Sequence, residues 1–204
     1  MPFSWDDGVE AYAAKPIGNP AAYEATMERA RAHLRPDMRV LEVGCGTGMT
    51  ARLLVPSVAH VTGTDISEAM IRLARRKAAE EGTENVAFER HAMDGPPLSG
   101  EPFDAVMAFN VLHLADDLDE AVRALARRVR PGGLAITKTP CLAGAWSVLW
   151  PVIGTMRMVG KAPRVLFLGR ARLERAFRDA GFEVLEAGDY PRRPPSRLVI
   201  ARRS

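Results

Sequence analysis

Short apolar runs alternate with longer amphipathic stretches along most of this chain. The apolar runs have the length and β-branched character of buried strands, whereas the stretches between them repeat apolar residues at helical spacing. The predicted strands lie at residues 38–44, 59–65, 86–91, 103–111 and 134–140. The helices predicted between them occupy residues 48–55, 67–82 and 117–133. Strands that alternate with helices favour βαβ units and a parallel sheet, so the fold class is α/β.

Both ends of the chain add further elements to this pattern. Asn19 and Pro20 predict the start of a helix that runs to about residue 34, because Asn is a good N-cap and Pro fits the first helical turn. Another helix is predicted at residues 170–182, followed by strands at 183–190 and 196–203. A turn alone separates those two strands, so they pair antiparallel or lie apart.

Two segments do not follow the alternation. Residues 1–19 form an irregular leader in which Phe3, Trp5 and Tyr12 are aromatic anchors. Residues 140–169 follow the fifth strand, at the carboxyl end of the sheet where ligands bind in open α/β folds. Three interpretations of residues 140–169 stay open: an apolar insertion that packs on the core, a cap over an apolar acceptor that the leader completes as a lid, or a surface helix that touches a membrane or a partner chain. The apolar residues of this segment are Trp146, Leu149, Trp150, Val152, Ile153, Met156, Met158, Val159, Val165, Leu166 and Phe167, and its cationic rim would be Arg157, Lys161, Arg164 and Arg170.

Composition narrows the class of protein without naming a function. The 204 residues fit one domain. The net charge of +3 comes from Arg-rich runs in which acids are interspersed, as in "RLARRKAAEEG", so we expect solvated helix faces and no nucleic-acid partner. Cys45 and Cys141 are too few for a disulfide framework or a Cys-rich zinc site, and we expect no metal. The chain shows no signal peptide or membrane span, so we predict a cytoplasmic monomer or homodimer.

The first predicted strand runs directly into a glycine-rich turn. Gly44, Gly46 and Gly48 have the spacing G-x-G-x-G, whereas a dinucleotide fingerprint requires glycine where Met49 stands, and a Walker motif requires a Lys-Ser/Thr pair. A backbone turn without a cation suits a carboxylate or a sugar edge better than a polyphosphate. Asp65 ends the next strand, where it can bind two ribose hydroxyls or cap a helix, and the glycine turn upstream favours the ribose.

Several of these runs together resemble a known family. "VLEVGCGTG", "GTDISEAMI", "FDAVMAFNVLHL" and "RVRPGGLAI" are similar to successive motifs of class I S-adenosylmethionine-dependent methyltransferases. The match is close over residues 38–138, and residues 170–203 also look like that family. The resemblance implies a Rossmann-like, doubly wound seven-stranded sheet in the order 3-2-1-4-5-7-6, mostly parallel with a final antiparallel hairpin strand. It also implies S-adenosylmethionine as the cofactor, whose carboxylate, ribose and sulfonium require no cation after the glycines.

The resemblance also implies which residues contact the cofactor. The methionine and ribose part would contact Glu42, Gly44, Cys45, Gly46 and Gly48. Asp65 would hold the ribose hydroxyls, and the adenine would contact Ile66, Met93 and Asp94. Asn110 would lie near the sulfonium, and Met70 would contribute from the apolar face of helix 67–82. For Asp94 the alternative is a solvated turn residue in "DGPP".

Methyl transfer requires little of the protein's side chains. The reaction is an in-line displacement at carbon with an activated donor, so the protein mainly aligns the acceptor and excludes water. The catalytic residue therefore stays unknown. His113 is a candidate base for a phenol or enol, and its alternative role is that of a pocket-wall residue. The base-flipping Asn/Asp-Pro-Pro-aromatic motif does not follow the fourth strand, which argues against a nucleobase amine as acceptor.

The sequence therefore predicts a methyltransferase that acts on a small, apolar or aromatic acceptor. The alternatives are a methyltransferase that acts on a lipid amine headgroup at a membrane surface, a non-catalytic S-adenosylmethionine-binding module, and a nicotinamide-dependent oxidoreductase. Met49 in place of the last fingerprint glycine argues against the oxidoreductase.

Overall fold

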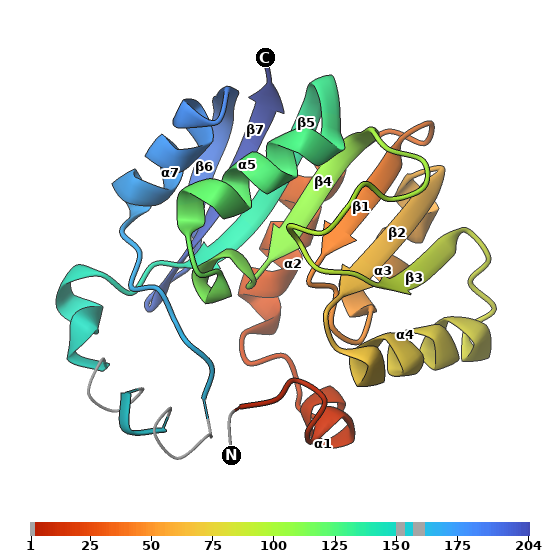
Figure 1. Ribbon diagram of the computed structural model, residues 1–204, viewed down its shortest axis with the longest axis horizontal. Coiled ribbons are helices and arrows are strands. Elements are labelled where there is room, and N and C mark those ends of the chain that lie inside the picture. Colours follow the sequence, from red (N-terminus) through yellow and green to blue (C-terminus); the bar gives the residue numbers. More distant parts are fainter. Residues whose placement is uncertain (1–2, 150–153, 157–161) are drawn as a thin grey trace.

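The computed structural model of the chain describes residues 3–149, 154–156 and 162–204. The strands form one sheet in the order β3-β2-β1-β4-β5-β7-β6 (Figure 1). β1 to β5 run parallel to one another, whereas β7 pairs antiparallel with both β5 and β6. The strand bounds are β1 Arg39–Val43, β2 His60–Asp65, β3 Val86–Arg90, β4 Phe103–Phe109, β5 Val129–Pro140, β6 Phe182–Arg192 and β7 Pro195–Arg203. The predicted strand order and the closing antiparallel hairpin are confirmed.

Helices cover both faces of the sheet (Figure 1). Buried residues of α2, α3 and α4 pack on one face, and those of α5 and α7 pack on the other, which is the doubly wound arrangement. The helix bounds are α1 Val9–Ala13, α2 Pro20–Ala32, α3 Met49–Leu54, α4 Glu68–Glu80, α5 Leu118–Arg128 and α7 Arg170–Asp179, with short 3₁₀ turns η1 Val55–Ser57, η2 Leu112–Leu114 and η3 Gly144–Leu149.

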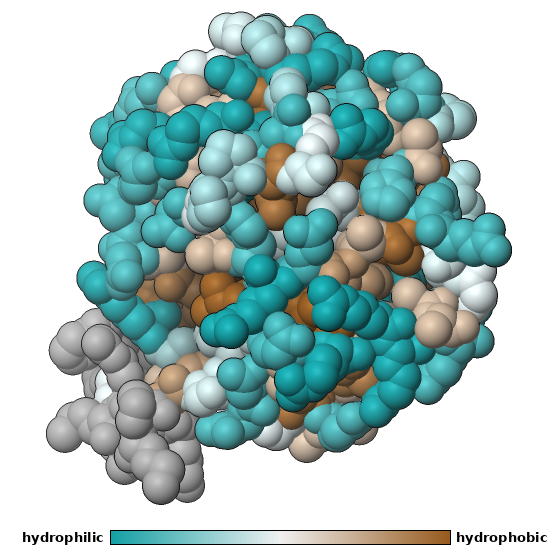
Figure 2. All heavy atoms as spheres, turned by 45° about the vertical axis from the view of Figure 1, so that its right-hand side comes forward, coloured by the Kyte–Doolittle hydropathy of each residue, from teal (hydrophilic) through white to brown (hydrophobic). Residues whose placement is uncertain are grey.

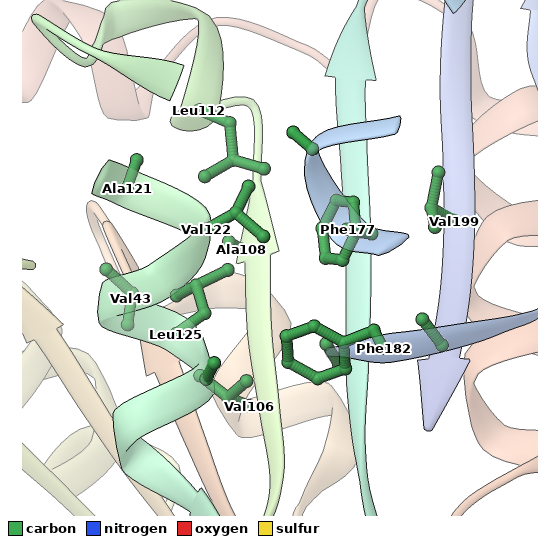
Figure 3. Packing of buried hydrophobic residues seen from close by; sticks show 14 of the residues in the cluster. Val43, Val106, Ala108, Leu112, Ala121, Val122, Leu125, Phe177, Phe182 and Val199 are labelled. Carbon is green, nitrogen blue, oxygen red and sulfur yellow. The ribbon is translucent and has the colours of Figure 1, made fainter. Parts of the chain in front are cut away.

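The apolar layer under α5 and α7 illustrates why the helices dock where they do. Val122 and Leu125 of α5 are fully buried against Val106 of β4 (Figure 3). Phe177 of α7 and Phe182 of β6 pack edge to face, with ring centroids 5.6 Å apart. Burial of one such side chain contributes about 1.5–3 kcal/mol, so the apolar stripe of each helix fixes its position on the sheet.

Side-chain caps begin two helices where the sequence predicts them. The Asn19 Oδ1 accepts a hydrogen bond from the Ala22 backbone N–H at 2.9 Å, with Pro20 at the first helical position. The Ser67 Oγ accepts one from the Met70 N–H at 3.1 Å. Each cap satisfies a donor that the first helical turn leaves unpaired.

The end of α5 and the leader differ most from the prediction. The predicted helix 117–133 ends at Arg128, because fully buried Val129 enters the sheet and pairs with Phe103. The "RPGG" run therefore lies in the first part of β5 and does not form the end of the helix. The leader is not irregular throughout, since residues 9–13 form the short helix α1.

The surface is dominated by charged side chains that pair with one another. On the face seen in Figure 2, hydrophilic residues cover most of the area and hydrophobic ones show between them in small areas. Arg123 and Arg127, for example, both bind Glu120 on α5. Most arginines of these runs therefore lie on solvated helix faces in which acids balance bases, and the buried Arg128 is the exception described below. Among the described residues, no helix combines the length and the apolar character that crossing a bilayer requires.

Candidate cofactor and acceptor pocket

One cavity of about 820 Å³ lies along the edge of the sheet where the parallel strands end. Its size is near the upper end of the range for ligand sites, about 300–1,000 Å³. Two walls matter for its chemistry. The glycine-turn wall consists of Glu42, Gly44, Cys45, Gly46, Asp65, Ile66, Met70, Met93, Asp94 and Asn110. The α2 wall consists of Tyr23, Thr26, Phe109 and Lys138.

The glycines of the turn have different environments. Gly46 has φ +53°, and a Cβ placed on it would meet no atom within 4 Å, so its backbone faces open cavity. Gly48 also has a positive φ, of +70°, but its Cβ would lie 2.5 Å from the Phe88 ring and 2.9 Å from the Ala74 Cβ. Of the predicted cofactor residues, Gly48 is the one that does not line the cavity. Its glycine is required for packing between the turn and the core.

Asp65 ties the glycine turn to the end of β2. Its Oδ2 accepts a hydrogen bond from the Gly46 N–H, and its Oδ1 accepts one from the Ser67 N–H, both at 2.9 Å. Burial raises the pKa of the carboxyl, while these backbone hydrogen bonds oppose the shift. The capping role and the ribose role are compatible, because an ionised carboxylate accepts about four hydrogen bonds and these backbone N–H groups do not use them all.

Glu42 is the buried acid of this wall. The residue is 3% exposed, and its Oε2 has no hydrogen-bond partner in the described part of the chain. Burial raises the pKa of Glu42 to about 8; a backbone hydrogen bond from Ala51 opposes the rise, and the nearby charge of Asp65 adds to it. A cationic ligand in the cavity would favour the ionised form and supply the missing partner. The residues present therefore fit an ammonium- and sulfonium-bearing cofactor.

The wall near the predicted adenine contacts is held by a residue that sequence reasoning missed. Arg128, at the end of α5, is 4% exposed, and its guanidinium donates hydrogen bonds to the carbonyls of Met93 at 3.1 Å and Gly95 at 3.0 Å. It also binds the Glu101 carboxylate. The loop that carries Met93 and Asp94 is thereby fixed against α5. In the sequence, Arg128 belongs to the run "RALARRVR" and looks like a surface base.

Asn110 connects the two walls. It follows β4 with φ +55°, a left-handed conformation that Asn adopts more readily than most residues. Its backbone N–H donates a hydrogen bond of 2.7 Å to the Lys138 carbonyl of β5. Asn110 and Lys138 are therefore adjacent at the end of the sheet. Lys138, in "ITKTP", was not predicted as a site residue, and neither were the other members of the α2 wall.

The leader closes one side of the cavity. Trp5, Tyr12 and Ile17 are among its lining residues. Asp6 fixes the leader to the start of α4: its Oδ1 accepts hydrogen bonds from the Ser67 Oγ at 2.7 Å and from the Ala69 N–H at 3.0 Å. Ser67 follows Asp65 by two residues in the sequence. The leader is thus attached to the helix that begins at the predicted ribose site.

His113 lies in η2 and is not among the residues that line the cavity. Burial lowers its pKa to about 4, and its Nδ1 has no partner among the described residues. The Leu166 N–H donates a hydrogen bond to the His113 carbonyl at 2.7 Å. The residue therefore lies in the contact between η2 and residues 162–168. Its position favours a structural role for His113 over that of a base.

The rest of residues 140–169 is described in part. Arg164 forms an ion pair with Asp116 at 2.9 Å, and Arg170 forms one with Asp189 at 2.8 Å. These two members of the predicted cationic rim are therefore paired within the chain. The predicted roles of Trp150, Val152, Ile153, Arg157, Met158, Val159 and Lys161 lie outside the described residues.

The fold and the pocket define a class of protein. The sheet is doubly wound, its glycine turn presents backbone to a cavity without a following cation, and an acid ends the second strand. These features are typical of a Rossmann-like domain that binds a nucleoside cofactor. Residues 40–133 match a family model described as a methyltransferase domain.

Comparison with known proteins agrees with this class. The chain is 41% identical over 102 residues to the ubiquinone biosynthesis O-methyltransferase of Alkalilimnicola ehrlichii, which is 50% of this chain and 41% of that protein. It is 35% identical over 157 residues to the protein of the same name from Thiobacillus denitrificans, which is 72% of this chain and 66% of that protein. The matches thus span between two fifths and two thirds of the length of these relatives.

A solved structure shows the same fold over the full chain. The geranyl diphosphate C-methyltransferase of Streptomyces coelicolor, in complex with Mg²⁺, geranyl diphosphate and S-adenosyl-L-homocysteine, superposes with a TM-score of 0.74 and 14% identity, covering 100% of both chains. The chain belongs to the class I S-adenosylmethionine-dependent methyltransferase family. The cofactor predicted from the sequence is the one that defines this family.

Proposed function

We propose that this protein transfers a methyl group from S-adenosylmethionine to a small aromatic or apolar acceptor. The observation that carries the proposal is that one cavity includes both walls, so a cofactor on the glycine turn and an acceptor on the α2 wall would share one space. Tyr23 and Phe109 offer ring surface to a planar acceptor. The named activity of the two curated relatives, O-methylation, supports oxygen as the acceptor atom.

The roles of the chain's own residues follow from their positions. When bound, the cofactor supplies an electrophilic methyl group. Gly46 and Asp65 would hold its ribose and methionine part, Glu42 would balance its positive charge, and Met93 and Asp94 would hold its adenine. The protein's contribution is to align the acceptor with the methyl group and to exclude water.

The leader and the segment after β5 would provide that exclusion. We propose that residues 1–19 act as a lid, because the described part of the leader lines the cavity and is attached to α4 through Asp6. Residues 140–169 would act as a cap on the acceptor side. The contact between Leu166 and His113 places part of this segment on η2, which directly follows the end of β4.

An acceptor screen tests the proposed function. Purified protein is first titrated with S-adenosylmethionine by calorimetry and then incubated with a panel of phenols, amines, thiols and carboxylic acids while S-adenosylhomocysteine is measured. We expect micromolar binding and turnover with members of the phenol group. Binding without turnover on the whole panel would support a non-catalytic module instead, and the absence of binding would refute the cofactor assignment.

The lipid-amine alternative requires a free cationic surface. Two of its four predicted cations, Arg164 and Arg170, are paired with acids of the chain. We therefore expect no cosedimentation with anionic phosphatidylglycerol vesicles at low salt. Strong binding that is lost at high salt would restore this alternative.

A further inference from the structure

Lys138 is a largely buried lysine in the α2 wall of the cavity. Its residue is 9% exposed. Side chains alternate along a strand, so Lys138 lies on the same face of β5 as Leu134 and Ile136, the face that α2 covers. Phe109 of β4 and Leu198 of β7 are its partners in the sheet register, and both are apolar.

The ammonium group of Lys138 has no partner in the chain as described. Across residues 3–149, 154–156 and 162–204, no carboxylate lies within ion-pair distance of it, and burial is the one cause of its lowered pKa. Other buried cations are paired. Arg128 binds Glu101, and Arg52, with 8% of its side chain exposed, binds Glu81 at 2.7 Å.

The stem of Lys138 is buried, whereas its unpaired ammonium is not among the fully buried nitrogen and oxygen atoms and belongs to the cavity lining. A partly desolvated cation without a counter-ion is a ready partner for an anionic ligand. Proteins retain buried charges when these are paired or when a ligand completes them. Lys138 stands at the edge of the cavity, next to Asn110, with aromatic rings from Tyr23 and Phe109 in the same wall. An anionic group on a flat ring could pair with the Lys138 ammonium while the ring packs against Tyr23 and Phe109.

We propose that Lys138 holds the reacting oxygen of the acceptor as an anion, so that the acceptor class is phenols and enols. The inference rests on the proposed function and makes its substrate class specific. The acceptor O–H loses its proton to water, and the ammonium stabilises the resulting oxyanion while keeping its own proton. The oxygen's electron pair then forms the new bond to the methyl carbon as the methyl–sulfur bond breaks and leaves its pair on sulfur.

Other ionisable groups around the cavity would not supply this contact. These groups lie in the leader, on α2, on the glycine-turn wall and at the start of α5. All except Lys15 and His91 are acids or neutral groups, which would not attract an oxyanion. They are Tyr12 and Lys15; Tyr23; Glu42, Cys45, Asp65, His91 and Asp94; and Asp116, Asp117 and Glu120. Lys15 is exposed, and the leader that carries it lies beside the glycine-turn wall. His91 belongs to the glycine-turn wall, where its Nδ1 lies 2.7 Å from the Ala92 carbonyl oxygen.

A spectroscopic titration tests the contact without turnover. The protein is saturated with S-adenosylhomocysteine, and 4-nitrophenol, whose anion absorbs visible light, is added over a range of pH. Wild type is expected to lower the pKa of the bound phenol by about 1–3 units, as an opposite charge within contact distance does. K138M should abolish the shift, and K138R should retain part of it. K77M, which removes a lysine outside the cavity, is the matched control.

A kinetic test then separates catalysis from folding. With S-adenosylmethionine and 4-methoxyphenol, K138M is expected to lower kcat by about 10²–10³-fold, as loss of an oxyanion contact does. With the more acidic 4-nitrophenol the loss should be much smaller, because that phenol ionises without help. The S-adenosylmethionine dissociation constant of K138M should equal that of wild type.

Three results would overturn the inference: an unshifted phenol pKa in wild type, an equal loss with both phenols in K138M, or wild-type turnover of amines or thiols alone. In the third case the proposed methyltransferase function would stand and only the substrate class would fail. Absence of turnover with every acceptor would instead contradict the proposed function, and the nitrophenol titration would still report on Lys138 independently.

Discussion

The two walls of the cavity are built in different ways. The glycine-turn wall presents backbone at Gly46, which has no side chain and whose N–H binds Asp65, and it adds the two acids Glu42 and Asp65 beside the turn. The α2 wall uses side chains, Tyr23, Phe109 and Lys138, which come from three separate elements. A backbone site can hold one cofactor through many changes of sequence, whereas a side-chain site changes its ligand with each substitution. We infer that the first wall fixes the donor and the second selects the acceptor.

The largest expected effect concerns the glycine of the turn that faces the core. Gly48→Ala would place a Cβ 2.5 Å from the Phe88 ring at φ +70°. Left-handed strain and overpacking together are expected to lower the free energy of unfolding by about 2–5 kcal/mol. Gly46→Ala, with open space around its Cβ, should lower the free energy of unfolding by only about 1–2 kcal/mol. It should weaken cofactor binding more than Gly48→Ala does, because Gly46 lines the cavity and Gly48 does not. Urea unfolding and calorimetry measure both, and equal stability losses would contradict the different roles of the two glycines.

The buried acid gives the next largest effect, through pH. Glu42 has a folded pKa of about 8, raised by burial from its ordinary value near 4.5, so between these values the folded state holds a proton that the unfolded state has lost. Its contribution to stability therefore falls as pH rises through this range, by up to about 1.4 kcal/mol per pH unit, and levels off above pH 8. Glu42→Gln should remove this decline.

Urea unfolding at pH 5.5, 7 and 8.5 measures this slope in both proteins, and identical slopes would show that Glu42 is ionised throughout. Cofactor binding gives an independent check. A cationic cofactor favours the ionised carboxylate, so its affinity for wild type should rise with pH up to about 8. In the Glu42→Gln variant this part of the pH dependence should be absent.

The sheet and the glycine-turn wall were predictable because their signals are local. A strand, a glycine turn and a helix cap are each encoded within a few neighbouring residues, as Asn19 and Ser67 show. The strand order and the cofactor came from the resemblance to a family, and the sheet confirms the order. The individual contacts between these residues and the cofactor stay predictions.

The α2 wall was not predictable, for a physical reason. Lys138 and Tyr23 are more than a hundred positions apart, and only the packing of α2 on the sheet brings both to the cavity. Neither residue carries a motif. Arg128 was missed because a buried arginine and a solvated one look alike in a basic helix. Most of the acceptors that its guanidinium binds are backbone carbonyl oxygens, which every residue type provides. The end of α5 was placed too late because Val129 fits a helix and a strand equally well by its pattern.

Asp65 tests whether the first wall holds a ribose. Asp65→Ala removes the oxygens that would accept hydrogen bonds from two hydroxyls, and we expect cofactor affinity to fall by about 1.5–3 kcal/mol, or roughly 10–150-fold. Because Asp65 also binds the Gly46 and Ser67 N–H groups, Asp65→Asn is the matched control, since its remaining oxygen can keep one of these bonds. An unchanged dissociation constant in Asp65→Ala would refute the ribose assignment.

The smallest expected effect concerns the leader, which lies beside the glycine-turn wall. Asp6→Asn weakens the contacts with the Ser67 Oγ and the Ala69 N–H, so the leader should open more often and the cofactor should dissociate several-fold faster. Hydrogen bonds, led by that from Ser67, lower the pKa of Asp6, so the contact is present above its unfolded pKa and is lost as pH falls through the folded value. Stopped-flow measurement of cofactor release is the test, and Asp7→Asn, a neighbouring exposed acid, is the control. If release from Asp6→Asn matched that from the control at every pH, the leader would be a fixed part of the pocket and would not act as a lid.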